Sequence, residues 1–240
     1  MRGLVIQREV TPAGVPEGVR VWLLSFALAG GRLDALMPLL SAHERARCLR
    51  FRRPPDRVRF AAARAALRMR LGALLGVPAA AVGIDIDTRG KPVLTGEPAL
   101  HFNLSHAGTC GLLALSESGP VGVDIEAAGC RPDVATLAAC LSPAERRHCD
   151  GAANARDFFR VWCGKEAVLK AWGVGFGMDP RALSVVPASA REYAVSPPPG
   201  YTAARAWPLR APRGYAAALA LSDPVAAVLG RQSEMAAEGG

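Results

Sequence analysis

The sequence predicts an α+β protein made of two similar halves, related by an internal duplication about a pseudo-twofold axis. Two observations lead to this prediction. Residues 40–76 match residues 141–177 without a gap, with ten identities in 37 positions, where this composition gives roughly 10% by chance. The tetrapeptide Leu113–Ser116, near the end of the first half, recurs as Leu219–Ser222 near the end of the second.

Each half also shows the same order of elements, a strand, a short capped helix, a long helix and several strands. In the first half we expect strands at 19–27, 84–88, 101–105 and 110–116, and helices at 41–50 and 56–75. In the second half we expect strands at 121–126, 183–187, 201–207, 214–221 and 225–229, and helices at 142–149 and 154–172. The expected bounds are 1–117 for the first half, 118–230 for the second and 231–240 for a disordered tail. A cleft between the halves is the natural place for a site.

Composition indicates a folded, positively charged protein. The 240-residue chain has a mean hydropathy of +0.17 and a net charge of +8, which favours nucleic acid, a phosphorylated cofactor or an acidic protein as partner. No apolar run approaches the ~18 residues of a spanning helix, and charges follow Met1 too closely for a signal peptide. The six cysteines show no C-x-x-C spacing, so we expect reduced thiols and no zinc site. We therefore expect a cytoplasmic protein with no membrane partner, and a monomer, because the two halves already supply both walls of a cleft.

The stretch Asp157–Gly173 has the apolar spacing of an amphipathic helix, with Asn154 available as its N-cap. Glu166 and Lys170 lie one turn apart on this helix, a spacing that in most proteins is an ordinary surface ion pair worth about 0.3–0.5 kcal/mol. The rarity of lysine favours a functional role for this pair, because this arginine-rich chain has only three lysines, Lys91, Lys165 and Lys170. A retained lysine suggests that a compact point charge is needed there.

The strand 121–126 carries two carboxylates on one face. Because side chains alternate along a strand, Asp124 and Glu126 project to the same side and repel each other unless a cation lies between them. Carboxylate oxygens with open positions suit Mg²⁺. With Glu166 and Lys170 from the helix, the set has the composition of a metal-bound diphosphate site.

The duplication places this chemistry in the second half alone. At the same offset, the first long helix has Ala65 and Met69 in place of Glu166 and Lys170. The first strand has Leu23 and Ser25 near the positions of Asp124 and Glu126.

Two further segments of the first half suit anions. Residues 41–60 are dense in arginine, which is either a solvated helix face or a phosphate cradle at the start of the second helix. Few aromatic residues alternate with these arginines, which argues against a single-stranded nucleic-acid platform. Ser105 and His106 are neighbours on a strand and point apart, so anion contact at a loop mouth is favoured over a Ser-His hydrolase.

Together these motifs resemble the surfactin-type 4′-phosphopantetheinyl transferases, the holo-carrier-protein synthases, over about residues 20–225. The resemblance lies in the order and spacing of six motifs: Gly90-Lys-Pro92, Phe102-Asn-Leu-Ser-His106, Gly122-Val-Asp-Ile-Glu126, Leu141-Ser-Pro-Ala-Glu145, Phe159-x-x-Trp162-x-x-Lys165-Glu166-Ala167-x-x-Lys170 and Gly173-x-Gly175-Phe176-x-x-Asp179-Pro180. The Arg50–Arg57 segment, with Pro54-Pro55, departs from the family pattern.

The resemblance implies a role for each matching residue. It implies the family's pseudo-duplicated α+β fold, Mg²⁺ held by Asp124, Glu126 and Glu166 together with the diphosphate of coenzyme A, and contact of Lys170 with that diphosphate. Asp124, Glu166 and Lys170 would be the catalytic residues. The implied contacts with the adenosine 3′-phosphate of coenzyme A are Lys91, Ser105 and His106, joined by Arg47 and Arg59, and the remaining implied coenzyme A contacts are Pro92, Lys165 and Lys170.

The implied reaction transfers the phosphopantetheine arm of coenzyme A to a serine of an apo acyl or peptidyl carrier protein, and releases 3′,5′-adenosine bisphosphate. An acidic carrier would suit the +8 charge, and the family suggests secondary metabolite biosynthesis. The base is either Glu166 or a metal-bound water. Three alternatives remain open: a paralogue that binds coenzyme A or carrier without turnover, another Mg²⁺-dependent phosphotransferase, and a basic nucleic-acid-binding protein. No Walker-type loop is present.

Overall fold

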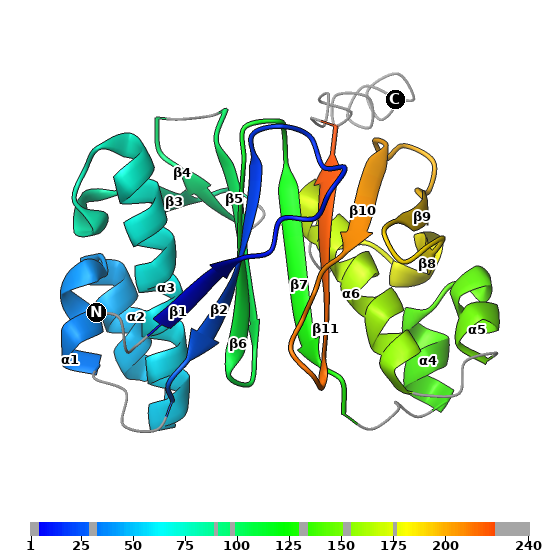
Figure 1. Ribbon diagram of the computed structural model, residues 1–240, viewed down its shortest axis with the longest axis horizontal. Helices are drawn as coiled ribbons and strands as arrows, with labels where there is room; N and C mark the ends of the chain where they lie inside the picture. The colour runs from blue at the N-terminus through cyan, green and yellow to red at the C-terminus, as the bar shows by residue number, and fades with distance from the viewer. Residues whose placement is uncertain are drawn as a thin grey trace, which may run out of the picture.

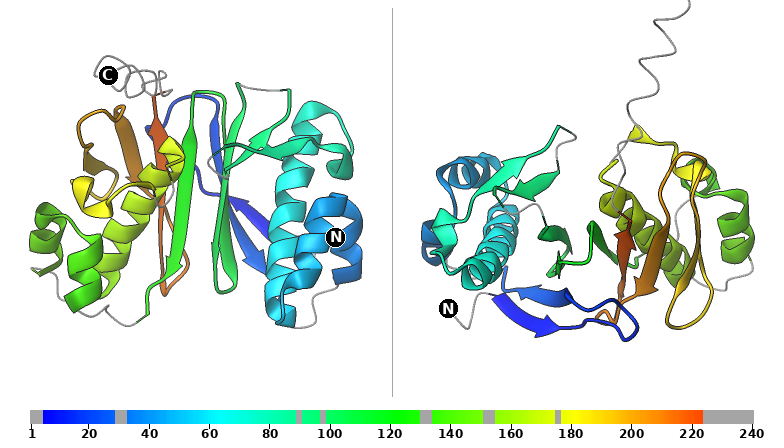
Figure 2. Two further views of the ribbon diagram at one scale, coloured as in Figure 1. Left: turned by 180° about the vertical axis from the view of Figure 1, so that it is seen from behind. Right: turned by 90° about the horizontal axis from the view of Figure 1, so that it is seen from above.

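Two antiparallel sheets stand side by side in the middle of the molecule, and each is covered on its outer face by helices of its own half (Figure 1). The view from above in Figure 2 shows the same layers, with helices on both outer sides. This computed structural model describes residues 5–28, 33–88, 91–96, 99–129, 134–150, 155–174 and 177–223. None of the helices in these segments is long and apolar enough to cross a membrane.

The first half has a four-stranded sheet in the order β1-β2-β6-β5 and a separate hairpin of β3 and β4. Its strands are β1 (Val5–Glu9), β2 (Val19–Phe26), β3 (Ile84–Ile86), β4 (Pro92–Leu94), β5 (His101–Ala107) and β6 (Cys110–Ser116). Its helices are α1 (Leu33–Leu36), α2 (Ala42–Arg50) and α3 (Pro54–Leu75). Alanines and leucines of α3 bury against Trp22, Leu24 and Phe26 of β2, forming the core of this half.

The second half has a five-stranded sheet in the order β7-β11-β10-β9-β8. Its strands are β7 (Val121–Ala127), β8 (Ser184–Pro187), β9 (Tyr193–Ser196), β10 (Ala204–Pro208) and β11 (Tyr215–Ser222). Its helices are α4 (Val134–Cys140), α5 (Pro143–Asp150) and α6 (Ala155–Trp172). α6 packs on this sheet as α3 packs on the other.

A third core joins the halves. Val21 and Leu23 of β2 and Leu112 of β6 meet Val123 and Ile125 of β7 between the two sheets. The halves therefore form one body, and the edge strands β5 and β7 come together at the junction.

The duplication is confirmed in the helices. α2 begins with a capping box in which the Ser41 side chain accepts from the Glu44 N–H and Glu44 accepts from the Ser41 N–H. α5 begins in the same way, because Ser142 and Glu145 form the same two bonds at 3.3 and 2.7 Å. The offset of 101 residues therefore describes real structural equivalents here.

The strand equivalence at that offset is wrong. Trp22 and Leu24 face α3, whereas Leu23 lies between the sheets. In β7 it is Asp124 that faces the helix of its half, where it bonds to Lys170. Leu23 is thus not the counterpart of Asp124, because a shift of one residue turns every side chain of a strand to the other face. The repeated tetrapeptides are mismatched for the same reason, since Leu113 faces α3 and Leu219 lies between the sheets.

The predicted helices and most predicted strands appear within a few residues of their expected bounds. Five short elements were not predicted, because elements of seven residues or fewer have too little periodicity to be recognised: β1, α1, β4, α4 and β9. α3 begins earlier than expected, at Pro54, because proline is favoured in the first turn of a helix. The predicted strand 225–229, the tail 231–240 and the Asn154 cap lie outside the described residues.

Candidate active site

The site is built where β5 of the first half meets β7 of the second. The side-chain oxygen of Asn103, on β5, accepts a hydrogen bond of 2.9 Å from the Val123 N–H on β7. Because both strands are sheet edges, this bond satisfies a backbone donor and fixes how the strands align. The alignment sets Ser105 beside Asp124.

Ser105, Asp124 and Lys170 meet at this junction. Asp124 is 2% exposed, and its Oδ1 accepts from Ser105 Oγ at 3.0 Å and from Lys170 Nζ at 2.6 Å. Lys170 Nζ also lies 3.2 Å from Ser105 Oγ. Three predicted site residues from two halves of the chain are thus in direct contact. Ser105, for which the resemblance implied the adenosine 3′-phosphate, lies instead with the residues implied for the metal and the diphosphate.

Gly122 allows this contact to form. A Cβ at Gly122 would lie 2.0 Å from the Ala167 carbonyl oxygen and 2.5 Å from the Ala171 nitrogen, both backbone atoms of α6. Only glycine permits so close an approach of β7 to α6. The approach lets a side chain two residues further along β7 reach Lys170.

The second oxygen of Asp124, Oδ2, is buried and has no hydrogen-bond partner. The Cys163 thiol lies close to Asp124 and donates to the Ala216 carbonyl oxygen at 3.4 Å. Burial, and then the negative charge of Asp124, raise the pKa of Cys163 well above the usual value. An unpaired buried carboxylate oxygen is costly and marks a place where a ligand would be favourable.

Glu126 and Glu166 lie near Asp124 and are half-buried. Burial raises the pKa of Glu126, and the charge of Asp124 raises it further. Burial also raises the pKa of Glu166, which Lys170 opposes and Asp124 reinforces. The three carboxylates thus share one region near the Lys170 ammonium group, a set that a divalent cation would stabilise.

The orphan Oδ2 of Asp124 and the crowded carboxylates fit a hard cation such as Mg²⁺. In the part of the chain that is described, no three His, Cys, Asp or Glu side chains are already spaced as a metal site. Lys170 holds Asp124 Oδ1 instead. The glutamates would therefore have to turn toward Asp124 for the three to bind one ion.

Lys91 also lies at this junction, where its ammonium contacts backbone carbonyl groups. Its ammonium donates to the carbonyl oxygens of Lys170, at 2.7 Å, and of Val121, at 3.3 Å. Lys91 precedes β4, so these bonds tie the β3–β4 hairpin of the first half to α6 and β7 of the second.

A cavity of about 390 Å³ lies in the first half beside the junction. Its lining contains three residues that the resemblance implied for coenzyme A, namely Arg47, Pro92 and His106. The remaining lining residues are Phe51, Phe60, Ala63, Arg64, Phe102, Asn103 and Leu104. None of these lining residues is acidic, so the cavity is a positive, partly aromatic space suited to an aromatic anion.

His106 connects the cavity to the junction. Partial burial lowers its pKa, and the charges of Arg59, Lys170 and Arg64 lower it further. It therefore lies near cations of both the cavity and the junction, and the lowered pKa favours the neutral imidazole near pH 7.

Two predicted contact residues are placed elsewhere. Arg59 donates to the Gly108 carbonyl oxygen at 2.8 Å and to Asp56 at 3.0 Å, so it supports the turn between β5 and β6 and does not line the cavity. Lys165 has no exposed side-chain surface. Its ammonium bonds to Glu145 at 2.6 Å and to the carbonyl oxygens of Cys140 and Pro180 at 2.9 and 2.7 Å. All three donors are used, so we do not retain a coenzyme A contact for Lys165.

Comparison with known proteins identifies the family. The profile of the 4′-phosphopantetheinyl transferase superfamily matches residues 120–220, and that of the 4′-phosphopantetheinyl transferase N-terminal region matches residues 30–118. The 4′-phosphopantetheinyl transferase HetI of Nostoc sp. strain PCC 7120 is 37% identical over 166 residues, covering 66% of this chain and 70% of that protein. The chain belongs to the 4′-phosphopantetheinyl transferase superfamily. It is therefore an enzyme of the transferase class.

Two further proteins are similar to this chain. A 4′-phosphopantetheinyl transferase of Bacillus subtilis is 29% identical over 164 residues, covering 66% of this chain and 71% of that protein. An ACPS–CoA complex from Chronobacterium ammoniagenes is 23% identical and covers 43% of this chain and 95% of that one, with a TM-score of 0.35.

Arg64 and Asn103 were not predicted as site residues. Asn103 lies inside the Phe102–His106 motif, so the motif indicated the residue but not its hydrogen bond to β7. Arg64 has no motif, and only its position one turn after Phe60 on the cavity face of α3 could have indicated it.

Proposed function

We propose that this transferase moves the 4′-phosphopantetheine arm of coenzyme A to a serine hydroxyl of an apo acyl or peptidyl carrier protein. A bond forms between the serine oxygen and the phosphorus that carries the arm. The bond from that phosphorus to the bridging oxygen breaks, and 3′,5′-adenosine bisphosphate leaves. The observation that carries the proposal is the meeting of Ser105, Asp124 and Lys170 beside an arginine-lined cavity free of lining carboxylates.

Asp124, Glu126 and Glu166 are the residues that would hold Mg²⁺. When bound, the ion supplies positive charge to the diphosphate of coenzyme A. Asp124 is already fixed by Ser105 Oγ, so one ligand is oriented in advance.

Lys170 carries the charge that meets the diphosphate. Its Nζ is held between Asp124 and Ser105, and its side chain is 30% exposed, so substrate can reach it. A point charge placed in advance stabilises negative charge that develops on the leaving group.

Glu166 is our candidate for taking the serine proton. Asp124 is engaged by Ser105 and Lys170, whereas no hydrogen bond to the Glu166 carboxylate is found among the described residues. Glu166 therefore keeps an oxygen available at the mouth of the junction.

The cavity beside His106 takes the adenosine end of coenzyme A. Phenyl rings suit the base, and Arg47 and His106 suit a phosphate. The carrier is acidic, to match the net charge of +8, and the enzyme acts as a cytoplasmic monomer.

The test is intact-mass spectrometry of an apo carrier protein incubated with the enzyme, coenzyme A and Mg²⁺. We expect the carrier to gain one phosphopantetheine arm, and the gain to be lost with EDTA. An unchanged carrier mass across acyl and peptidyl carriers, with coenzyme A still bound, would favour a member that binds without turnover. Failure to bind coenzyme A as well would contradict the proposal entirely.

A further inference from the structure

We propose that Lys91 of the first half is a positioning residue, whose ammonium holds together the end of α6 and the start of β7. These two elements carry Lys170 and Asp124. The inference rests on the proposed function, because it concerns how Lys170 keeps its place at the diphosphate. It departs from the resemblance, which implied a contact of Lys91 with the adenosine 3′-phosphate.

The ammonium of Lys91 lies between backbone oxygens of the second half. It is 2.7 Å from the Lys170 carbonyl oxygen and 3.3 Å from that of Val121, the first residue of β7. One cation therefore bridges the helix that carries Lys170 and the strand that carries Asp124. Hydrogen bonds from an ionised donor are roughly twice as strong as neutral ones, so this bridge restrains both elements.

The Lys170 carbonyl lies where a helix needs an external donor. α6 ends at Trp172, and the last four carbonyl groups of a helix have no partner of the regular helical pattern. The N–H of Gly173, which has a left-handed φ of 69°, reaches the Lys170 oxygen at 3.2 Å. Lys91 adds a shorter bond to the same oxygen and places a positive charge at the negative end of the helix dipole.

The first half shows why this contact belongs to α6. α3 continues as a helix past Gly72, which stands 101 residues before Gly173, and ends at Leu75. The carbonyl at the place of Lys170, that of Met69, therefore lies inside the helix, where the next turn of α3 supplies its donor. Because α6 ends directly before Gly173, an external donor has to supply what the continued helix supplies in α3.

Lys91 extends from a segment that is itself held. Its N–H donates to Asp87 Oδ1 at 2.8 Å, and its carbonyl oxygen accepts from the Asp87 N–H at 2.9 Å. The next residue, Pro92, begins β4 and has a backbone angle fixed by its ring. These restraints limit where the ammonium can lie, so its contact restrains α6.

The contact acts on Lys170 because both the backbone and the ammonium of Lys170 are held. Its carbonyl oxygen meets Lys91, and its Nζ lies 3.2 Å from Ser105 and 2.6 Å from Asp124. A charged group stabilises a developing charge best when it is placed in advance, and a misplacement of about 1 Å can cost 100-fold in rate. Without the Lys91 ammonium, the last turn of α6 loses a charged partner and Lys170 loses a fixed base.

The same geometry argues against a phosphate at Lys91. Pro92 lines the cavity, whereas Lys91 is not among the described residues that line it. A phosphate at the ammonium would compete with two carbonyl oxygens that are already within 3.3 Å. Lys91 therefore serves the geometry of the site and does not contact the substrate.

The first experiment follows amide hydrogen exchange in the free protein, so it does not depend on the transfer reaction. In Lys91→Met we expect residues 171–174 to exchange about tenfold faster, because a charged hydrogen bond at the helix end is lost. Lys91→Arg keeps a cation and should restore much of the protection. Unchanged exchange at the end of α6 would overturn the inference. If Lys91→Met does not fold, Lys91→Gln decides in the same way, with exchange at least about threefold faster as the supporting result.

The second experiment asks whether Lys91 acts through Lys170. Coenzyme A binding in the presence of Mg²⁺ is measured by calorimetry for the wild type, Lys91→Met, Lys170→Met and the double variant. We expect Lys91→Met to weaken binding about 3- to 10-fold in the wild type but less than about twofold in Lys170→Met, since residues that act together are not additive. Equal weakening in the two backgrounds would overturn the inference.

Nucleotide preference separates positioning from phosphate contact. 3′,5′-Adenosine bisphosphate and adenosine 5′-monophosphate differ only in the 3′-phosphate. We expect Lys91→Met to keep the ratio of the two affinities within about twofold of the wild type. A larger fall in this ratio would show that Lys91 contacts the 3′-phosphate, and the inference would be wrong.

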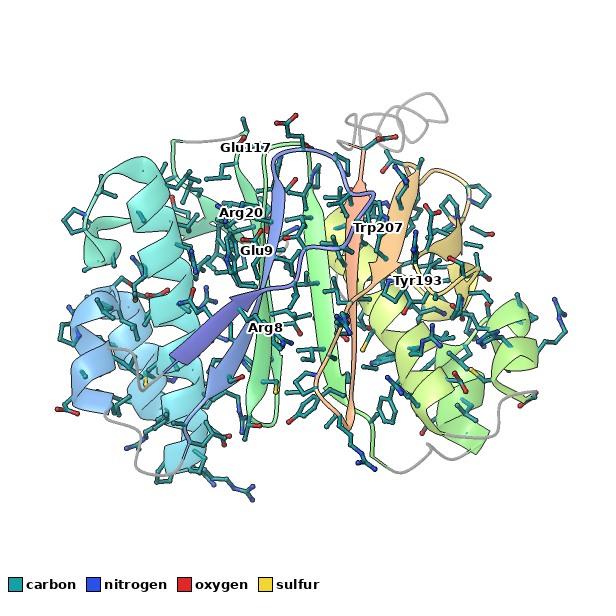
Figure 3. All side chains as sticks on the ribbon, viewed as in Figure 1. Arg8, Glu9, Arg20, Glu117, Tyr193 and Trp207 are labelled. Atoms are coloured by element: carbon teal, nitrogen blue, oxygen red, sulfur yellow. The ribbon has the colours of Figure 1, made fainter. Side chains whose placement is uncertain are left out.

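Arg20→Met is the matched control. Arg20 pairs with Glu9 at 2.7 Å on the outer strands of the first half, away from α6 (Figure 3). The variant removes one cation from the same half and should leave both the exchange at the end of α6 and the affinity for coenzyme A unchanged. A wild type that neither binds coenzyme A nor modifies a carrier would contradict the proposed function, whereas the exchange result still decides whether Lys91 holds α6.

Discussion

The long helices α3 and α6 occupy equivalent places in the two halves but leave different side chains available for chemistry. In α6, Lys165 is buried against Glu145, and the following turn directs Lys170 to the junction. In α3, Arg68 is buried against Glu44, and Arg64 lines the cavity. Each half therefore keeps one buried ion pair for its own stability and leaves other side chains of its long helix facing the junction or the cavity.

The largest expected effect tests the buried pair of the second half. Lys165→Met leaves Glu145 buried without its cation and should reduce the free energy of unfolding by about 3–5 kcal/mol, measured by urea titration. Arg64→Met is the counterpart and should cost less than about 1.5 kcal/mol, because Glu44 keeps Arg68. Equal losses in the two variants would show that the two positions have the same role.

Gly122→Ala tests the close approach of β7 to α6, a feature described here for the second half alone. The added Cβ would collide with the backbone of Ala167 and Ala171, so we expect a loss of about 3 kcal/mol and a fall in transfer activity. Gly129→Ala is the control, because a Cβ there meets nothing within 4 Å. Normal stability of Gly122→Ala would contradict the packing described here.

Asn103→Ala tests the bond that joins the halves at the site. It removes the acceptor for the buried Val123 N–H and should cost about 1–2 kcal/mol in unfolding free energy, while lowering kcat through displacement of Asp124. Asn103→Asp keeps an oxygen at the same place and should recover part of the stability. If kcat is unaffected by Asn103→Ala, the bond does not position Asp124.

The smallest effect is a pH dependence of stability from β5. Burial lowers the pKa of His101, with a further contribution from Lys91, and burial also lowers the pKa of His106. Below about pH 6.5 the unfolded chain therefore binds more protons at these histidines than the folded one, so their contribution makes the free energy of unfolding fall as the pH drops from about 6.5 toward the lowered pKa values. His101→Gln should flatten this slope between pH 5.5 and 7.5 in urea titrations, and an unchanged slope would contradict it.

Much of this architecture was predictable from the sequence, because capped helices with a repeated Ser-x-x-Glu signal keep their local chemistry in any context. The convergence of Asp124 and Lys170 was predictable as well, since the motifs that carry them are specific, whereas the contact of Ser105 with Asp124 was not predicted. The face to which each strand side chain points was not predictable. The ungapped match rests on identities in the helices, so a shift of one residue in the strands leaves most of those identities unchanged.

The roles of Lys165 and Arg64 could not be read from the sequence for a different reason. A cation serves the fold or a ligand according to which acceptors lie within its reach, and for Lys165 two of these are backbone carbonyls far along the chain. Arg64 lacks a close carboxylate partner because Arg68 forms the ion pair with Glu44, and the sequence does not show which of the two arginines does so.

We propose that the second half carries the transfer chemistry and the first half holds the nucleotide. One variant tests it directly, Glu166→Gln, with carrier modification followed by intact mass and binding of 3′,5′-adenosine bisphosphate followed by calorimetry. We predict that transfer falls about 100- to 10,000-fold while affinity for the bisphosphate stays within about twofold of the wild type. Near-normal transfer, or loss of both activities in a folded protein, would contradict the account.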